Sequence, residues 1–89
     1  MIRRTFEIKN KLGLHARPAA LFVQSASQFK SKVKIIKDGL EVDGKSIMGI
    51  MMLAAAQGMQ IDVTVDGEDE QSVMQKIEEL IQKKFDEDE

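Results

Sequence analysis

The first third of the chain changes from an alternating hydrophobic pattern to a helical one. Apolar and polar side chains alternate around Phe6 and Ile8, which predicts a half-buried strand over residues 2–9. Over residues 16–29 the apolar side chains recur every three or four positions, which predicts a helix with one face in the core. The predicted core face consists of Ala19, Phe22, Val23, Ala26 and Phe29.

The middle of the chain predicts a hairpin followed by an unusually apolar helix. Residues 32–37 and 40–42 have strand character, and Asp38-Gly39 between them is a strong signal for a two-residue turn. Ser46 is a good N-cap for a helix over residues 47–53 that is apolar on every side. A small domain cannot bury all of these side chains, so we expect part of the helix to be exposed. Burial of the whole helix in a methionine-rich core is the alternative.

The last third predicts a strand and a charged helix. Apolar residues alternate over residues 61–65, and Asp66-Gly67 then turns the chain. The predicted helix then begins with the acidic run 68–70 and ends with Lys83-Lys84, and these charges match the helix dipole at both ends. Its predicted core face consists of Val73, Ile77, Leu80 and Ile81. We expect the acidic tail 86–89 to be a frayed, solvated charge run.

The elements follow one another in the order βαββαβα. The simplest two-layer solution is an antiparallel four-stranded sheet with three helices on one face, an α+β fold. The 89 residues suit a single domain, residues 1–89, and no internal repeat or linker divides them.

Composition removes several classes of function. The chain is 43% hydrophobic and 31% charged, which is typical of a soluble globular protein. It has no cysteine, so disulfides and cysteine-based zinc sites are excluded. A net charge of −2, with no Trp or Tyr, does not favour nucleic-acid binding. We find no signal peptide and no apolar run as long as a membrane span. The absence of cysteine is compatible with the cytosol.

The only histidine, His15, stands where a strand gives way to a helix. Gly13 precedes it, and Pro18 suits the first turn of a helix, where its missing N–H has no role. A helix N-terminus attracts anions, and Arg17 adds donors whose geometry suits phosphate. The helix end and Arg17 also disfavour a second positive charge on the imidazole. These features indicate a histidine that accepts a phosphoryl group; the alternative is an inert surface or core histidine.

Two segments of the chain resemble one known family. Residues 10–19 (NKLGLHARPA) resemble the active-site segment of HPr, the histidine phosphocarriers of the bacterial sugar phosphotransferase system. Residues 45–51 (KSIMGIM) resemble the regulatory serine region of that family. The resemblance runs over essentially the whole chain, and it implies an open-faced β-sandwich.

The resemblance also implies a function. His15 would accept a phosphoryl group from enzyme I, which phosphoenolpyruvate charges, on the ring nitrogen nearer the backbone. It would then pass the group to an enzyme IIA domain, with Arg17 binding the phosphate. Such a protein is a cytoplasmic, monomeric carrier rather than an enzyme, and it needs no cofactor or metal. The residues that match the docking surface of the family are Leu14, Ala20, Gln24, Ile47, Met48 and Met51.

Ser46 has two interpretations that are compatible with each other. It is a plain helix cap, or it is also the target of an HPr kinase/phosphorylase, as the resemblance implies. A phosphate within an apolar docking surface would repel acidic partners. Transcriptional regulators are further possible partners in this family.

Other readings remain open from the sequence. Leu12 and the acidic ending 85–88 resemble the nitrogen-related branch of the family, whereas residues 45–49 resemble the sugar branch, which we favour. His15 excludes the catabolite-repression paralogue that lacks the histidine. In other classes, a protein-binding module with an inert His15 stays possible. A metal-dependent hydrolase is poorly supported by one histidine and scattered carboxylates.

Overall fold

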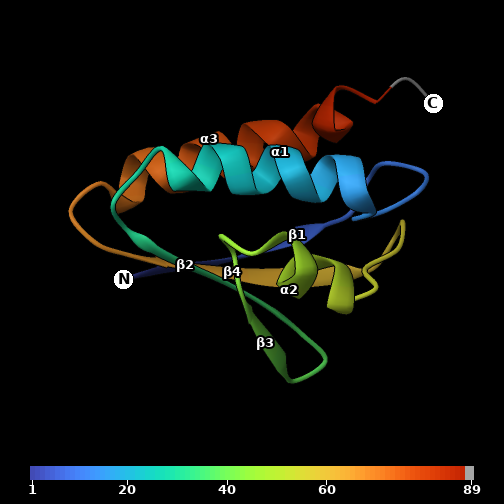
Figure 1. Ribbon diagram of the computed structural model, residues 1–89, viewed down its shortest axis with the longest axis horizontal. Coiled ribbons are helices and arrows are strands. Elements are labelled where there is room, and N and C mark those ends of the chain that lie inside the picture. Colours follow the sequence, from blue (N-terminus) through green and yellow to red (C-terminus); the bar gives the residue numbers. More distant parts are fainter. Residues whose placement is uncertain (88–89) are drawn as a thin grey trace.

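A single antiparallel sheet forms one layer of the protein, and helices cover one of its faces (Figure 1). The computed structural model describes residues 1–87. The elements in chain order are β1 (Ile2–Glu7), α1 (Ala16–Ser27), β2 (Lys32–Lys37), β3 (Leu40–Asp43), α2 (Ile47–Met52), β4 (Gln60–Asp66), α3 (Glu70–Gln82) and the short turn η1 (Lys84–Asp86). The predicted order βαββαβα and the α+β open-faced sandwich are confirmed.

The strands lie in the order β1-β4-β2-β3, with every neighbouring pair antiparallel. In β4 the side chains of Ile61, Val63 and Val65 are fully buried, and the residues between them are less buried. The alternation seen in the sequence is therefore the alternation of a sheet with one covered face. Val63 pairs with Ile35 of β2, so the two central strands share the core.

The helices α1 and α3 run side by side over the sheet (Figure 1), and α1 also contacts α2. Both long helices turn their predicted faces inward, although Val23, Phe29 and Leu80 are only partly buried. Met74, which the pattern did not single out, is buried in α3. The fully covered side chains of the two helices are Pro18, Ala19, Phe22 and Ala26 in α1, and Val73, Met74, Ile77 and Ile81 in α3.

The helix ends differ slightly from the prediction. α1 stops at Ser27, two residues before Phe29, and α3 stops at Gln82, just before Lys83 and Lys84. α3 begins at Glu70, and its N-cap residue Asp69 makes no side-chain capping bond. The Asp69 carboxylate instead accepts hydrogen bonds from the amides of Lys30 and Ser31 and from the Ser31 hydroxyl.

The loop before α1 is fixed to the segment after α2. The amide of Ile8 donates to Met59 O at 2.9 Å, and the amide of Gly58 donates back to Ile8 O at 2.8 Å. Further along, the amide of Leu14 donates to Ala55 O at 2.9 Å. The residues that precede His15 are therefore held by backbone bonds rather than left as a free loop.

The expectation of a frayed acidic tail is wrong for Glu87. After α3 the chain turns through Lys84, Phe85 and Asp86, all with positive φ, and Phe85 is buried with 1% of its surface exposed. Burying that large aromatic side chain brings the end of the chain back to the body of the protein. Asp86 is exposed as expected, and residues 88 and 89 of the predicted tail lie outside the described residues.

The alternative of a fully buried α2 is also wrong. Ile50 is buried, whereas Ile47, Met48, Met51 and Met52 are exposed. Within residues 1–87 we find no helix long and apolar enough to cross a lipid bilayer.

Candidate functional site

His15 is the N-cap residue of α1. Its backbone is extended, with φ −78° and ψ −170°, and its carbonyl accepts the first helical hydrogen bond from the Ala19 amide at 3.0 Å. Its ring makes no capping bond to the described chain, and 35% of the side-chain surface is exposed. The imidazole therefore stands at the start of the helix and is accessible from outside.

The first turn of α1 is suited to an anion. Pro18 has no amide hydrogen, so the amides of Ala16 and Arg17 are the donors that this turn can direct at a ligand. A positive partial charge accumulates at this end of the helix, and it favours negative groups. Arg17 is exposed in the same turn, two residues after His15, as the sequence predicts.

A carboxylate from the far end of the chain meets the imidazole. Glu87 Oε2 lies 2.7 Å from His15 Nε2, and only 10% of the Glu87 side chain is exposed. Sequence reasoning missed this residue because 72 positions separate the pair. The acidic composition of the tail indicated solvent, and no local pattern predicts the return of the chain.

The side chain of Asn10 donates a hydrogen bond to the Glu87 carboxylate. Its Nδ2 donates to Gly13 O at 2.6 Å and to Glu87 Oε1 at 2.9 Å. The Asn10 side chain is fully buried, and its Oδ1 has no hydrogen-bond partner within residues 1–87. A buried amide of this kind is costly to move, so it gives Glu87 a fixed anchor.

Most of the predicted docking residues lie on the surface. Met48 is 72% exposed, Ile47 is 40% exposed and Met51 is 42% exposed. Gln24 is exposed and Ala20 is half-buried on α1. A shallow depression beside the imidazole is lined by Leu12, Leu14, His15, Met51, Ala54, Ala55 and Ala56.

Leu14 differs from the other predicted docking residues in being nearly buried, although it lines the depression beside His15. Its side chain is only 4% exposed, because the bond from its amide to Ala55 O directs this part of the loop into the core. The sequence did not select Leu12 and Met52 for this role, although they are 70% and 66% exposed. Apolar residues so well exposed are a stronger sign of a contact surface than Leu14 is.

Ser46 is the N-cap of α2. Its Oγ accepts a hydrogen bond from the Gly49 amide at 3.0 Å, which confirms the predicted cap. The side chain precedes Ile47 and Met48 directly, so a group added to its hydroxyl would stand beside exposed apolar side chains.

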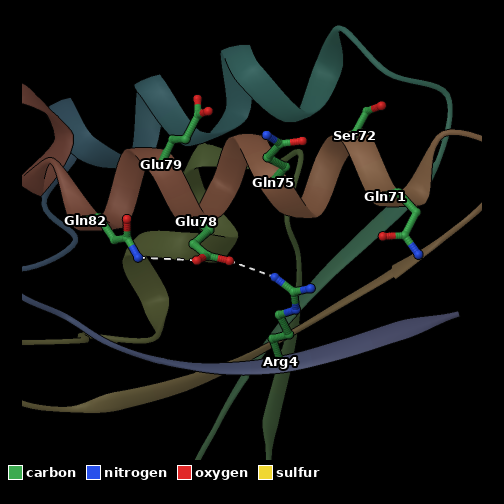
Figure 2. A pocket seen from close by; sticks show the side chains of 7 residues that line it. All are labelled: Arg4, Gln71, Ser72, Gln75, Glu78, Glu79 and Gln82. Carbon is green, nitrogen blue, oxygen red and sulfur yellow. Dashed lines mark hydrogen bonds and ion pairs between the residues drawn. The ribbon is translucent and has the colours of Figure 1, made fainter.

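Another hollow lies on the outer face of α3 and contains none of the predicted site residues. Figure 2 shows Arg4 of β1 reaching toward Glu78, and their Nη1 and Oε1 atoms are 2.7 Å apart. Gln82 donates to the same carboxylate at 3.2 Å. Arg4, Glu78 and Gln82 are therefore engaged with one another. Among residues 1–87 there is also no cluster of His, Cys, Asp or Glu suited to a metal ion.

Comparison with known proteins agrees with the geometry. The family model described as "PTS HPr component phosphorylation site" matches residues 2–83. The phosphocarrier protein HPr of Neisseria meningitidis serogroup B is 52% identical over 89 residues, covering all of both chains. The HPr-like protein Crh of Bacillus subtilis is 46% identical over 92% of this chain and 96% of its own length. A crystal structure of HPr from Thermoanaerobacter tengcongensis covers all of both chains, at 49% identity and a TM-score of 0.95. This chain therefore belongs to the HPr family of the phosphotransferase system.

Proposed function

We propose that this protein is a phosphocarrier that holds a phosphoryl group on His15 between two partner proteins. The single observation that carries the proposal is the accessible imidazole of His15 at the N-terminus of α1. Membership of the HPr family supports it. The site has one nucleophile and, among the described residues, no metal cluster, so partner proteins must complete the chemistry.

The transfer is a displacement at phosphorus. A lone pair on the His15 ring attacks the phosphoryl group carried by a histidine of enzyme I, and a new N–P bond forms. The old P–N bond breaks, and its electron pair returns to the donor imidazole. Arg17 and the amides of the first turn of α1 neutralise the charge on the phosphoryl oxygens. The second transfer, to an enzyme IIA domain, is the same step with His15 as the leaving group.

The partners would dock on the exposed apolar surface of α2 and the adjoining side of α1. Ile47, Met48 and Met51 supply adaptable apolar contacts, and Gln24 and Ala20 extend the surface along α1. One surface that serves both enzyme I and enzyme IIA must fit two partners, and methionine suits that requirement. The carrier would work as a monomer in the cytoplasm.

Ser46 would add regulation to the same surface. Phosphorylation by an ATP-dependent HPr kinase/phosphorylase would place a charge of about −1.5 to −2 beside Ile47 and Met48. Such a charge would weaken docking of enzyme I. Transcriptional regulators that bind the phosphoserine form would be further partners.

The test is phosphorylation by enzyme I and phosphoenolpyruvate. The wild-type protein should gain one acid-labile phosphoryl group, whereas folded His15→Ala should gain none. Ser46→Ala serves as the control and should be labelled as well as the wild type, because its acceptor ring is intact. Labelling of His15→Ala would refute the proposal, and absence of label on the wild type would favour a binding module with an inert histidine.

A second candidate is the nitrogen-related branch of the family. The observation that favours it is Leu12, whose side chain is 70% exposed in the depression beside His15. Preference of the phosphorylated protein for a nitrogen-related enzyme IIA over a sugar-specific one would select this branch.

A further inference from the structure

We infer that Glu87 is a positioning residue for phosphotransfer: it accepts the Nε2 proton of His15 and thereby leaves Nδ1 as the nucleophilic nitrogen. This inference rests on the proposed phosphotransfer at His15. The contact that carries it joins Glu87 Oε2 and His15 Nε2 at 2.7 Å.

A chain of hydrogen bonds fixes the direction of this contact. The Gly13 carbonyl can only accept, so the Asn10 group facing it is the amide nitrogen, at 2.6 Å. The same nitrogen donates its second hydrogen to Glu87 Oε1 at 2.9 Å. Because Asn10 is fully buried, its amide has little freedom to reverse. The Glu87 carboxylate is thus held with its second oxygen on the imidazole.

An ionised carboxylate has no hydrogen to give. A ring nitrogen 2.7 Å from it must therefore carry the proton, and in a neutral imidazole the other nitrogen then carries the lone pair. For His15 the other nitrogen is Nδ1. When Nδ1 forms its bond to phosphorus, the ring keeps its Nε2 proton and becomes positively charged, and the Glu87 carboxylate is in place to stabilise that charge. This is the role of the carboxylate in a hydrolase triad, here without a serine.

The backbone around Glu87 supports a built contact rather than a chance one. Lys84, Phe85 and Asp86 have φ values of 54°, 54° and 59°, in the left-handed region that costs about 1–2 kcal/mol for each residue that has a side chain. Phe85, which is 1% exposed, anchors that turn in the core. Strained residues in succession persist only where the surrounding structure requires them. Here the turn formed by residues 84–86 brings the Glu87 carboxylate to the imidazole of His15.

The decisive variant is Glu87→Gln. The Gln oxygen would take the place of Oε1 opposite the Asn10 donor, so the Gln amide would face Nε2. An amide donates, so Nε2 would have to accept, and the proton would move to Nδ1. The matched control is Glu79→Gln, which makes the same change of charge at an exposed position on α3; Figure 2 shows Glu79 turned away from the Arg4–Glu78 pair.

Two readouts test the inference, and the first needs no partner protein. Ring ¹⁵N NMR, at a pH where the imidazole is neutral, should show the Nε2–H tautomer in the wild type and in Glu79→Gln. It should show a shift to Nδ1–H in Glu87→Gln. The rate of phosphorylation by enzyme I at limiting concentration should fall in Glu87→Gln by about tenfold or more, as when a group that orients a histidine is removed, and stay unchanged in Glu79→Gln.

The outcomes separate this inference from the proposed function. An Nε2–H tautomer retained in Glu87→Gln would overturn the inference even if His15 is phosphorylated. A reversed tautomer with an undiminished transfer rate would also overturn it, since Glu87 would then orient the ring without effect on transfer. Absence of phosphorylation in the wild type refutes the proposed function instead, and the tautomer spectra would still report on the contact.

Discussion

The amide of Leu14 donates to the carbonyl of Ala55 at 2.9 Å, and this bond fixes the residue before His15 to the segment after α2. Gly13, one residue earlier, allows the close approach. It has φ +70°, and a Cβ placed on it would collide with the Ala55 carbonyl oxygen and lie 2.9 Å from Ala56 Cα. The site histidine is therefore positioned by a backbone contact that tolerates no side chain at residue 13.

Gly13→Ala should destabilise the fold and disturb the site together. The left-handed conformation alone costs about 1–2 kcal/mol for alanine, and the collision with backbone atoms adds to that cost. We expect a total loss above about 2 kcal/mol in the free energy of unfolding. Urea unfolding measures this loss, and the rate of His15 phosphorylation should fall as well.

Gly39→Ala is the matched control for that prediction. Gly39 also has a positive φ, +83°, but nothing lies within 4 Å of a Cβ placed on it. It should lose only the conformational part, about 1–2 kcal/mol, with no change in phosphorylation. Equal losses in the two variants would show that the contact with Ala55 does not matter.

Arg17→Ala should slow transfer far more than it affects stability. Arg17 is exposed, and exposed substitutions usually change the free energy of unfolding by no more than about 0.5 kcal/mol. If Arg17 binds the phosphoryl oxygens as proposed, removing the guanidinium takes those donors away, and the rate of phosphorylation by enzyme I should drop markedly. Arg3→Ala on β1 is the control: it removes a guanidinium that pairs with Asp62, and it should leave the rate of phosphorylation unchanged. Equal rates in wild type and Arg17→Ala would contradict the assigned role.

Ser46→Ala and Ser46→Asp should separate capping from regulation. Alanine removes the acceptor of the Gly49 amide and should cost about 1 kcal/mol. Aspartate keeps an acceptor and a favourable charge at the helix end, so thermal stability should stay equal or rise slightly.

The transfer rates of the same variants complete the test. Ser46→Asp, as a partial mimic of phosphoserine, should lower the rate of His15 phosphorylation at limiting enzyme I, whereas Ser46→Ala should not. An unchanged rate in folded Ser46→Asp would leave Ser46 as a helix cap alone, and would favour the nitrogen-related branch.

The sequence predicts the sheet and the helices well because their signals are local. Alternation in β4 and the three- to four-residue spacing in α1 each follow from a face that packs on one core. The position of His15 at a helix start is local too, since Gly13 and Pro18 surround it. Placement of Ser46 as a cap follows from its own hydroxyl and a neighbouring amide.

The Glu87 contact could not be predicted in this way. It depends on the burial of Phe85 and on three successive residues with positive φ, none of which is glycine. Asn10, which anchors the carboxylate, reads as an ordinary loop residue in the sequence. The near-complete burial of Leu14 could not be predicted for a related reason: the direction in which a loop side chain points depends on backbone bonds such as the one to Ala55.

Asp69 should make stability depend on pH in the acid range. The Ser31 hydroxyl donates to its carboxylate, as do the amides of Lys30 and Ser31, and these bonds hold the pKa of Asp69 below its ordinary value of 3.8. A pKa that is lower in the folded state gives stability that is fully present above the unfolded value and is lost as pH falls through the folded one. Asp69→Asn should therefore have a lower melting temperature than the wild type at neutral pH. The difference should shrink as pH falls from 3.8 toward the lower pKa of the folded state, because the unfolded chain then binds a proton that the folded Asp69 carboxylate does not.

The matched control is Asp38→Asn in the hairpin turn between β2 and β3. Asp38 is exposed with φ 51°, a conformation that asparagine adopts as readily as aspartate does. Its carboxylate lies 3.2 Å from Lys37 Nζ but is 85% exposed, and an ion pair with so exposed a carboxylate contributes little, so the melting temperature should stay close to that of the wild type at every pH. Melting temperatures by circular dichroism from neutral to acid pH provide the measurement. The bonds from Ser31 and Lys30 are made to Asp69 and not to Asp38. If the melting temperatures of Asp69→Asn and Asp38→Asn depend on pH in the same way, these bonds do not contribute the pH-dependent stability.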